Sequence, residues 1–388
     1  MARWQLIVLV VILSGTLASC ANVRQGVAWP DLELVTINDQ PRVLIVYDGQ
    51  IEAIDPYQGA QVHVIRDADG AIVLDENNNA REWIIRGNQL DGAQFFTSPL
   101  REDDTFLFPT YNGRMLTVDV QTATVENVAG IPLTDGVIAD PVVSDELIYV
   151  PYRSQDVVAL DHETYEEVWR FSDTEGGVWA SPLLYDGVLY VTSIDHFLYA
   201  IDAQTGEAIW DQPVDLEGAV ASTPAIYNDY LYVGSYSHDV YQISLDGEIV
   251  NSYEGNNWVW STPVIEDDIL YYTDLSGYVY ALNATDLSEI WVVRPSNRGI
   301  RPGPILTDNF VVVATRNGNV YWLSRETGST VQEAQVENRP ELLSDILYLP
   351  ADADSGRPEL MLVASTENRR LVSAFNMETF SLQWVYQR

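Results

Sequence analysis

A pattern of about 41 residues that returns along the chain constrains the fold more than any other feature of the sequence. Its first marker is a proline that follows a small or polar residue and opens an apolar run. Successive copies of this proline lie 42, 41, 42, 39 and 41 residues apart. They are Pro99, Pro141, Pro182, Pro224, Pro263 and Pro304. A unit of this length cannot bury its apolar faces alone, so neighbouring copies must pack against one another.

A second marker repeats with the same period. It is an apolar run that ends in a small polar residue before a turn, and it occurs eight times. The copies end at Asp55, Asp119, Asp161, Asp202, Ser244, Asn283, Ser324 and Asn376. Two gaps are wider because polar insertions, at 67–86 and 350–359, interrupt the first and the last unit.

The stretch from Ser181 to Trp210 shows what one unit contains. The runs SPLLY, VLYVTS and FLYAID read as three short strands, and EAIW reads as the beginning of a fourth. Turns that contain Gly187 and Gly206 separate them, as expected for β-hairpins. Helical repeats are excluded, because no segment keeps a helical spacing of apolar residues for three turns.

Four strands with a period near 41 residues are typical of a β-propeller blade. The sequence therefore predicts an all-β protein in which residues 30–388 form a single propeller domain. The eight markers predict eight blades of four antiparallel strands each. A seven-bladed ring is the alternative, because the first unit matches the pattern least well.

The charge of the chain excludes one class of partner. It carries 20 basic residues, all of them arginine, and 57 acidic ones, for a net charge of −37. Such a surface repels nucleic-acid phosphates, so we expect no nucleic-acid partner. The single cysteine allows no internal disulfide, and the histidines His63, His162, His196 and His238 form no cluster. The sequence therefore predicts no metal site.

The N-terminus reads as a targeting segment. Arg3 precedes the apolar run Leu6–Leu13, and Leu17-Ala18-Ser19-Cys20 resembles the lipobox of bacterial lipoproteins. This predicts a lipoprotein signal peptide at 1–19, followed by a lipidated N-terminus and short tether at 20–29. Acyl chains on Cys20 would hold the protein on a membrane as an extracytoplasmic lipoprotein, at the cell surface or the outer membrane. An ordinary secretory signal with an incidental cysteine is the alternative.

The consensus A-[IL]-[DN]-x-x-T-G-x-x-x-W, best matched by Ala200–Trp210, is similar to the repeat of the pyrroloquinoline quinone (PQQ)-type β-propellers. The resemblance implies that the tryptophan docks between blades by stacking near the Thr-Gly turn. This position is filled by Trp169, Trp210, Trp291 and Trp384. The copies that end at Asp55, Asp119, Ser244 and Ser324 lack it, so different contacts are expected there.

The resemblance also bears on function. Enzymes of this family oxidise alcohols or sugars with the quinone and calcium, and often carry an adjacent cysteine pair. This chain has one cysteine, no lysine and no calcium set that can be matched, so we expect neither a cofactor nor an enzyme. It resembles instead the lipid-anchored, non-enzymatic branch that includes the propeller lipoprotein of the outer-membrane β-barrel assembly machine. That branch implies a monomeric scaffold with an envelope protein as its partner. The alternatives are a PQQ-dependent dehydrogenase-like enzyme and a glycan- or small-ligand-binding propeller.

One set of positions is a candidate binding rim. The residue three places before each marker proline lies on the loop that enters a strand, and in PQQ-type propellers that strand is innermost. These residues are Phe96, Ile138, Trp179, Ala221, Trp260 and Arg301. Aromatic and arginine side chains are enriched in binding hot spots, which selects Phe96, Trp179, Trp260 and Arg301. In the alternative, Trp179 and Trp260 fill the axis as core, and Arg301 then needs a carboxylate partner.

Overall fold

The computed structural model describes residues 30–387, apart from 48, 58–60, 68, 76, 103, 353–354, 368 and 370. The predicted signal peptide, the tether and Cys20 therefore lie outside the described residues. Within the described part, no helix has the length and apolar character that crossing a bilayer requires.

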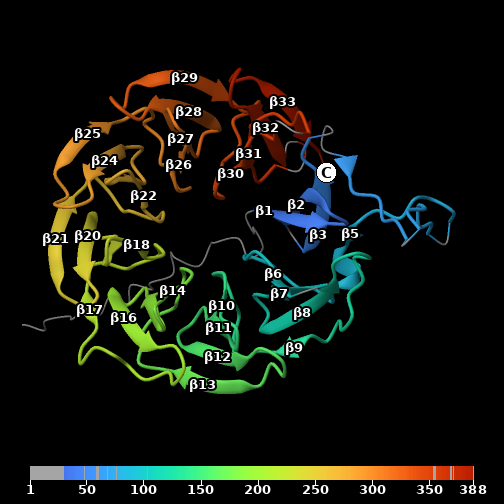
Figure 1. Ribbon diagram of the computed structural model, residues 1–388, viewed down its shortest axis with the longest axis horizontal. Coiled ribbons are helices and arrows are strands. Elements are labelled where there is room, and N and C mark those ends of the chain that lie inside the picture. Colours follow the sequence, from blue (N-terminus) through green and yellow to red (C-terminus); the bar gives the residue numbers. More distant parts are fainter. Residues whose placement is uncertain are drawn as a thin grey trace, which may run out of the picture.

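The described residues form eight antiparallel sheets arranged in a ring (Figure 1). Seven sheets contain four strands each, and the first contains five. Within every sheet the strands are consecutive in the chain, as in an up-and-down meander. The prediction of an eight-bladed β-propeller is confirmed, and the seven-bladed alternative is wrong.

The first four blades contain β1 (Asp31–Ile37), β2 (Gln40–Tyr47), β3 (Gln50–Asp55), β4 (Gln61–Val62) and β5 (Ile84–Ile85); β6 (Leu100–Glu102), β7 (Thr105–Pro109), β8 (Arg114–Asp119) and β9 (Ile131–Pro132); β10 (Val142–Val143), β11 (Leu147–Pro151), β12 (Val157–Asp161) and β13 (Glu167–Phe171); and β14 (Leu183–Tyr185), β15 (Val188–Thr192), β16 (Phe197–Asp202) and β17 (Val214–Asp215). The last four contain β18 (Ala225–Tyr227), β19 (Tyr230–Gly234), β20 (Asp239–Ser244) and β21 (Ile249–Glu254); β22 (Val264–Glu266), β23 (Ile269–Thr273), β24 (Val279–Asn283) and β25 (Glu289–Val293); β26 (Ile305–Leu306), β27 (Phe310–Ala314), β28 (Asn319–Ser324) and β29 (Thr330–Gln335); and β30 (Leu347–Leu349), β31 (Leu360–Ala364), β32 (Val372–Asn376) and β33 (Leu382–Tyr386).

The first strand of each blade lies nearest the axis and the last lies at the circumference (Figure 1). The two middle strands are apolar without alternation, as in β15 and β16, where eight of the eleven residues are buried. A blade lies between two neighbours, so both faces of its middle strands are covered, and continuous apolar runs are what such strands need. The core accordingly divides into eight clusters, and each spans the contact between two adjacent blades.

The second sequence marker forms a turn with the same hydrogen-bond pattern in four copies, those that end at Asp119, Asp161, Asp202 and Asn376. Oδ1 of Asp202 accepts hydrogen bonds from the backbone N–H of Gln204 and from both the N–H and the hydroxyl of Thr205. Gly206 follows with a φ of +73°, which a side chain with a Cβ rarely adopts. The Asp-x-x-Thr-Gly spacing therefore encodes the link between the third and fourth strands.

The four tryptophans assigned to blade docking each donate an indole N–H to the next blade. Nε1 of Trp169 lies 3.1 Å from the carbonyl oxygen of Ala203. The corresponding distance is 3.0 Å from Trp210 to Leu245 and 2.9 Å from Trp291 to Arg325. In every case the acceptor directly follows the marker residue, which is how the indole comes to lie on the turn. A Cβ built on Gly206 would lie only 2.7 Å from the Trp169 ring.

One expectation about these contacts is wrong. The copy that ends at Asp55 does have a docking tryptophan, because Nε1 of the fully buried Trp83 lies 2.7 Å from the carbonyl oxygen of Val120. The insertion separates Trp83 from its marker, so the regular spacing does not reveal it. The copy at Ser244 does use a different contact, since the Tyr232 hydroxyl donates to the carbonyl of Ala284 at 2.6 Å.

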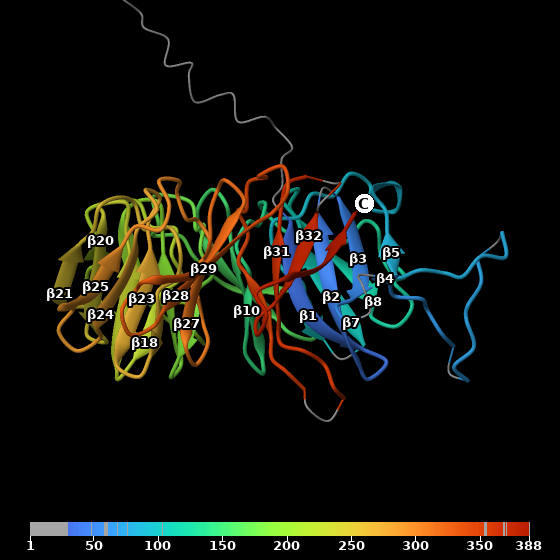
Figure 2. The same ribbon diagram turned by 90° about the horizontal axis from the view of Figure 1, so that it is seen from above.

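The insertion of the first blade is an arm that projects from the ring between β4 and β5 (Figures 1 and 2). Both short strands pair with β3, so the arm divides the outer strand of the blade into two pieces. Isolated bridges, such as Val64 to Glu82, join the two sides of the arm.

The fourth strand of the blade at 181–215 also differs from expectation. Glu207–Trp210 was predicted to begin it, but β17 is Val214–Asp215, and only an isolated bridge joins Ile201 to Ala208. The Asp-Gln-Pro segment between them separates the two regions, because Pro213 has no N–H to give to the ladder.

The ring closes where the last blade packs directly on the first, without exchange of a strand. Nε1 of Trp384 lies 3.0 Å from the carbonyl oxygen of Pro56, which repeats the docking contact of the other blades. The Tyr386 hydroxyl donates to the buried Glu52 carboxylate at 2.7 Å. Apolar side chains of both blades form one cluster at this seam, among them Val43, Ile45, Ile54, Leu349, Leu360, Leu362 and Val372.

Candidate functional site

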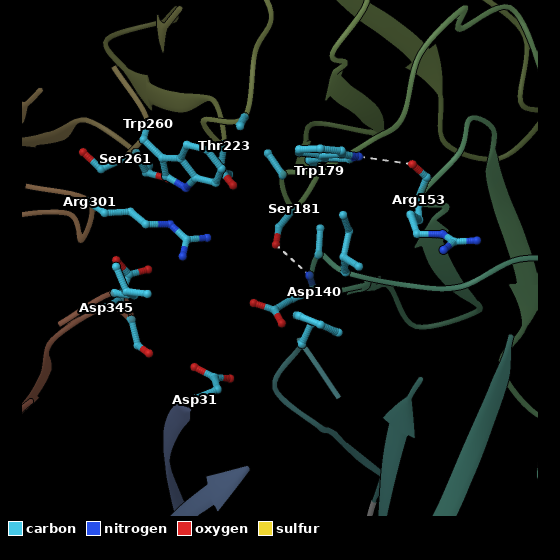
Figure 3. Close-up of a pocket in the computed structure, with 18 of the residues that line it drawn as sticks. Asp31, Asp140, Arg153, Trp179, Ser181, Thr223, Trp260, Ser261, Arg301 and Asp345 are labelled. Carbon is cyan, nitrogen blue, oxygen red and sulfur yellow. Dashed lines mark hydrogen bonds between the residues drawn. The ribbon is translucent and has the colours of Figure 1, made fainter. Parts of the chain in front are cut away.

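The mouth of the central channel is the candidate site. The loops that enter the inner strands converge there and line a cavity of about 950 Å³ (Figure 3). All six positions that lie three residues before a marker proline line this cavity, including the rim candidates Phe96, Trp179, Trp260 and Arg301. The structure thus brings together residues from six different blades.

One wall of the cavity is formed by Trp260 and Arg301, and two further aromatic rings stack behind Trp260. The rings of Trp258 and Tyr236 are parallel within 4°, with centroids 4.9 Å apart. The ring centroids of Tyr236 and Trp260 are 5.7 Å apart, and the Arg301 guanidinium lies 4.5 Å from the centre of the Trp260 ring. This contact is a cation–π interaction, which fixes the direction in which Arg301 extends.

The opposite wall is held by Arg153. Its guanidinium lies 4.4 Å from the centre of the Tyr111 ring and 3.1 Å from the Asp135 carboxylate. Its backbone carbonyl accepts a hydrogen bond from the indole N–H of Trp179 at 3.1 Å (Figure 3). The Trp179 side chain is nevertheless 43% exposed, so it lines the cavity instead of filling the axis. Phe96 packs beside Tyr111, with the two ring centroids 5.3 Å apart.

The rest of the cavity lining carries three carboxylates, from Asp31, Asp140 and Asp345. Figure 3 shows them facing the same space into which Arg301 extends. The Ser98 hydroxyl donates to Asp31, and the Ser98 N–H lies 2.8 Å from Oδ1 of Asp140. The N–H of Gly303 donates to Asp345 at 2.9 Å. We call Asp31, Asp140 and Asp345 the acidic floor.

The acidic floor holds its protons more tightly than ordinary carboxyl groups. Removal from bulk water raises the pKa of all three, and for Asp140, with Asp31 as a like-charged neighbour, the pKa rises to about 7. Glu33, next to the acidic floor on β1, also has a raised pKa, of about 8, because of burial and the charges of Asp31 and Asp140. Burial also lowers the pKa of Arg301, to about 10, so it remains charged at neutral pH.

Sequence reasoning found the rim but missed the acidic floor. Asp140 directly precedes a marker proline, and the residues at that place in most other copies are serine, threonine or glycine. An acidic residue at this position could have indicated a carboxylate at the cavity. Asp345 occupies the same position in the last copy, but Ile346 replaces the marker proline there, so the pattern does not reveal Asp345.

The cavity does not suit the quinone cofactor that enzymes with PQQ-type repeats bind. Pyrroloquinoline quinone is itself a tricarboxylate, and here it would meet three carboxyl groups and two cations, Arg301 and Arg153, of which Arg153 already pairs with Asp135. Among the described residues, no group of three or more histidine, cysteine, aspartate or glutamate side chains is placed to hold a metal ion.

Comparison with known proteins gives a family model and two solved structures that resemble this propeller. A PQQ-type repeat model described as outer membrane protein assembly factor BamB matches residues 124–334 and 198–388. The crystal structure of BamB from Moraxella catarrhalis is similar at 17% identity and a TM-score of 0.64, over 88% of this chain and 93% of that one. The computationally designed protein Ika8 is similar at 14% identity and a TM-score of 0.65, over 91% and 98%. No curated protein sequence matches significantly. At these identities the solved structures show likeness of fold.

Proposed function

Because the chain belongs to the PQQ-like propeller family of outer membrane protein assembly factor BamB, we propose that it is a lipid-anchored scaffold that takes part in outer-membrane protein assembly. In this proposal Cys20 carries the lipid, the propeller lies on the outer side of the cytoplasmic membrane, and the ring binds an envelope protein without catalysing a reaction. The family match, which spans 124–388, is the observation that carries the proposal.

The architecture supports a binding role. Propellers present loops on two faces of a rigid ring, and those faces are where partners bind. Here each blade is fixed to the next by a buried cluster, and most blades add a docking hydrogen bond, so the loops at the cavity are held on a stable frame. A site on a rigid frame needs little ordering when a partner binds.

The cavity also supports a role without catalysis. Its carboxylates have raised pKa values, which can mark an acid or base in an enzyme. In this cavity those shifts have a structural origin, because Asp31 and Asp140 are partly buried and lie close together as like charges. The dehydrogenase alternative would need an anionic cofactor in this acidic space.

Co-purification from membranes tests the proposal. The lipidated chain is extracted in a mild detergent and compared with Cys20→Ser, which we expect to leave the membrane fraction while it remains folded. We expect the wild-type protein to co-purify with outer-membrane β-barrel proteins or their assembly factors. A wild-type sample that stays monomeric and free of partners in that detergent would refute the scaffold role.

A further inference from the structure

The cavity at the channel mouth combines two features that together select a class of ligand. Its walls are aromatic, with Trp179, Trp260, Phe96 and Tyr111 presenting rings, and it is large enough for one side chain and its neighbours. Its floor is acidic. Aromatic faces and carboxylates both attract cations, and the aromatic faces also accept the apolar stem of a long basic side chain.

The lining carries more carboxyl groups than cations. The charged residues that line the cavity are Asp31, Asp140, Asp345, Arg153 and Arg301. Arg153 is paired with Asp135 outside the lining, which leaves Arg301 beside three carboxyl groups whose pKa values are raised. Ionising these neighbouring carboxyl groups together is costly, and a further positive group would offset that cost.

We propose that this cavity receives an arginine or lysine side chain from a loop of a protein partner, with its charged group at the acidic floor and its stem between Trp179 and Trp260. The inference deepens the proposed scaffold function and rests on it for the partner's being a protein. A partner with basic residues also complements a chain that has no lysine and a net charge of −37.

The proposal implies that binding depends on pH. The acidic floor combines Asp31 from β1, Asp140 from the loop before β10 and Asp345 from the loop before β30. The charged groups beside it are Glu33 from β1 and Arg301 from the loop before β26. Raising the pH from about 6 to about 8 removes protons from this set, because the pKa of Asp140 is about 7. Arg301 keeps its charge over that range. A bound cation should therefore be held more tightly at the higher pH.

Isothermal titration calorimetry of the purified lipidated protein in non-ionic detergent tests this directly. The probe is a blocked glycine–serine peptide with one central arginine, and its matched control carries citrulline, which has the same shape without the charge. We expect the arginine peptide to bind roughly tenfold more tightly, because charge-assisted hydrogen bonds are the stronger kind. The difference should shrink at high salt and at the lower pH.

Two pairs of variants locate the site. Asp345→Asn and Trp179→Ala should each weaken the arginine peptide roughly tenfold, as expected for hot-spot residues. Asp186→Asn makes the same charge change on the turn between β14 and β15, at the other end of the blade. Ile249→Ala removes an apolar side chain of similar exposure, 45%, from the outer strand β21, which does not line the cavity. Both controls should bind like the wild type.

The outcomes separate this inference from the scaffold proposal. Equal binding of arginine and citrulline peptides, or equal loss in target and control variants, overturns it, even if co-purification succeeds. Tighter binding of spermidine than of the arginine peptide overturns it in favour of a free polyamine. Binding of a neutral oligosaccharide that Trp179→Ala abolishes, with no arginine preference, overturns it in favour of a glycan site.

Discussion

Removal of the Trp83 side chain should destabilise the propeller more than removal of any exposed tryptophan. The Trp83 ring is fully buried between the first two blades, and it lies edge-on to Phe106 with centroids 6.1 Å apart. Its indole N–H donates to the carbonyl of Val120 at 2.7 Å. The side chain therefore contributes both apolar contact and the hydrogen bond that fixes one blade to the next.

The two contributions can be separated by substitution. Trp83→Ala removes both, and a buried tryptophan reduced to alanine costs about 3–5 kcal/mol. Trp83→Phe keeps most of the ring but leaves the carbonyl of Val120, a fully buried residue, without this donor, which costs about 1–3 kcal/mol. The difference, about 2 kcal/mol, is the share of apolar packing.

Urea unfolding followed by far-ultraviolet circular dichroism measures these costs, with Trp258→Ala as the control. Trp258 is 46% exposed and stacks on Tyr236, so its loss should cost about 1 kcal/mol or less. If Trp83→Ala shifts the midpoint no further than Trp258→Ala, the docking role argued for Trp83 is wrong. If Trp83→Phe matches the wild type, the hydrogen bond to Val120 contributes nothing.

Three further outcomes follow from the fold. Gly206→Ala should destabilise more than Gly187→Ala, by about 1–3 kcal/mol in thermal melts, since both glycines have positive φ but only a Cβ at Gly206 would meet an indole ring. Tyr386→Phe should cost about 1–3 kcal/mol, because it takes a donor from the buried Glu52, and an unchanged melting temperature would contradict this. Glu33 has a folded pKa of about 8, so the folded state keeps a proton that the unfolded chain loses near its ordinary value of 4.5. Stability should therefore fall as the pH rises between these values, less steeply in Glu33→Gln than in the wild type, and equal slopes would contradict the assignment.

The repeat could be predicted from the sequence because its signals are short-range. Asp202, Thr205 and Gly206 form one turn through their own backbone, so their spacing survives in any context. The docking partner of Trp210 is the matching turn of the next copy, and a constant period fixes its place. For the same reason the number of blades could be counted from the markers.

Features that depend on closure of the ring or on an insertion could not be predicted in the same way. Trp83 has the same role as Trp210 but lies beyond a projecting arm, where the period gives no position for it. The acidic floor joins residues from the first, third and last blades, and Asp31 and Asp345 are neighbours only because the circle closes. The spacing of Asp31 and Asp345 in the sequence therefore does not predict that they lie close together.

The direct seam between first and last blades has a consequence for biosynthesis. The ribosome makes β1–β5 long before β30–β33, so the face of the first blade formed by Val43, Ile45 and Ile54 has no cover until the final strands emerge. Such bare apolar surface invites aggregation in a nascent chain. Anything that covers that face until the C-terminal strands arrive would therefore favour correct closure of the ring.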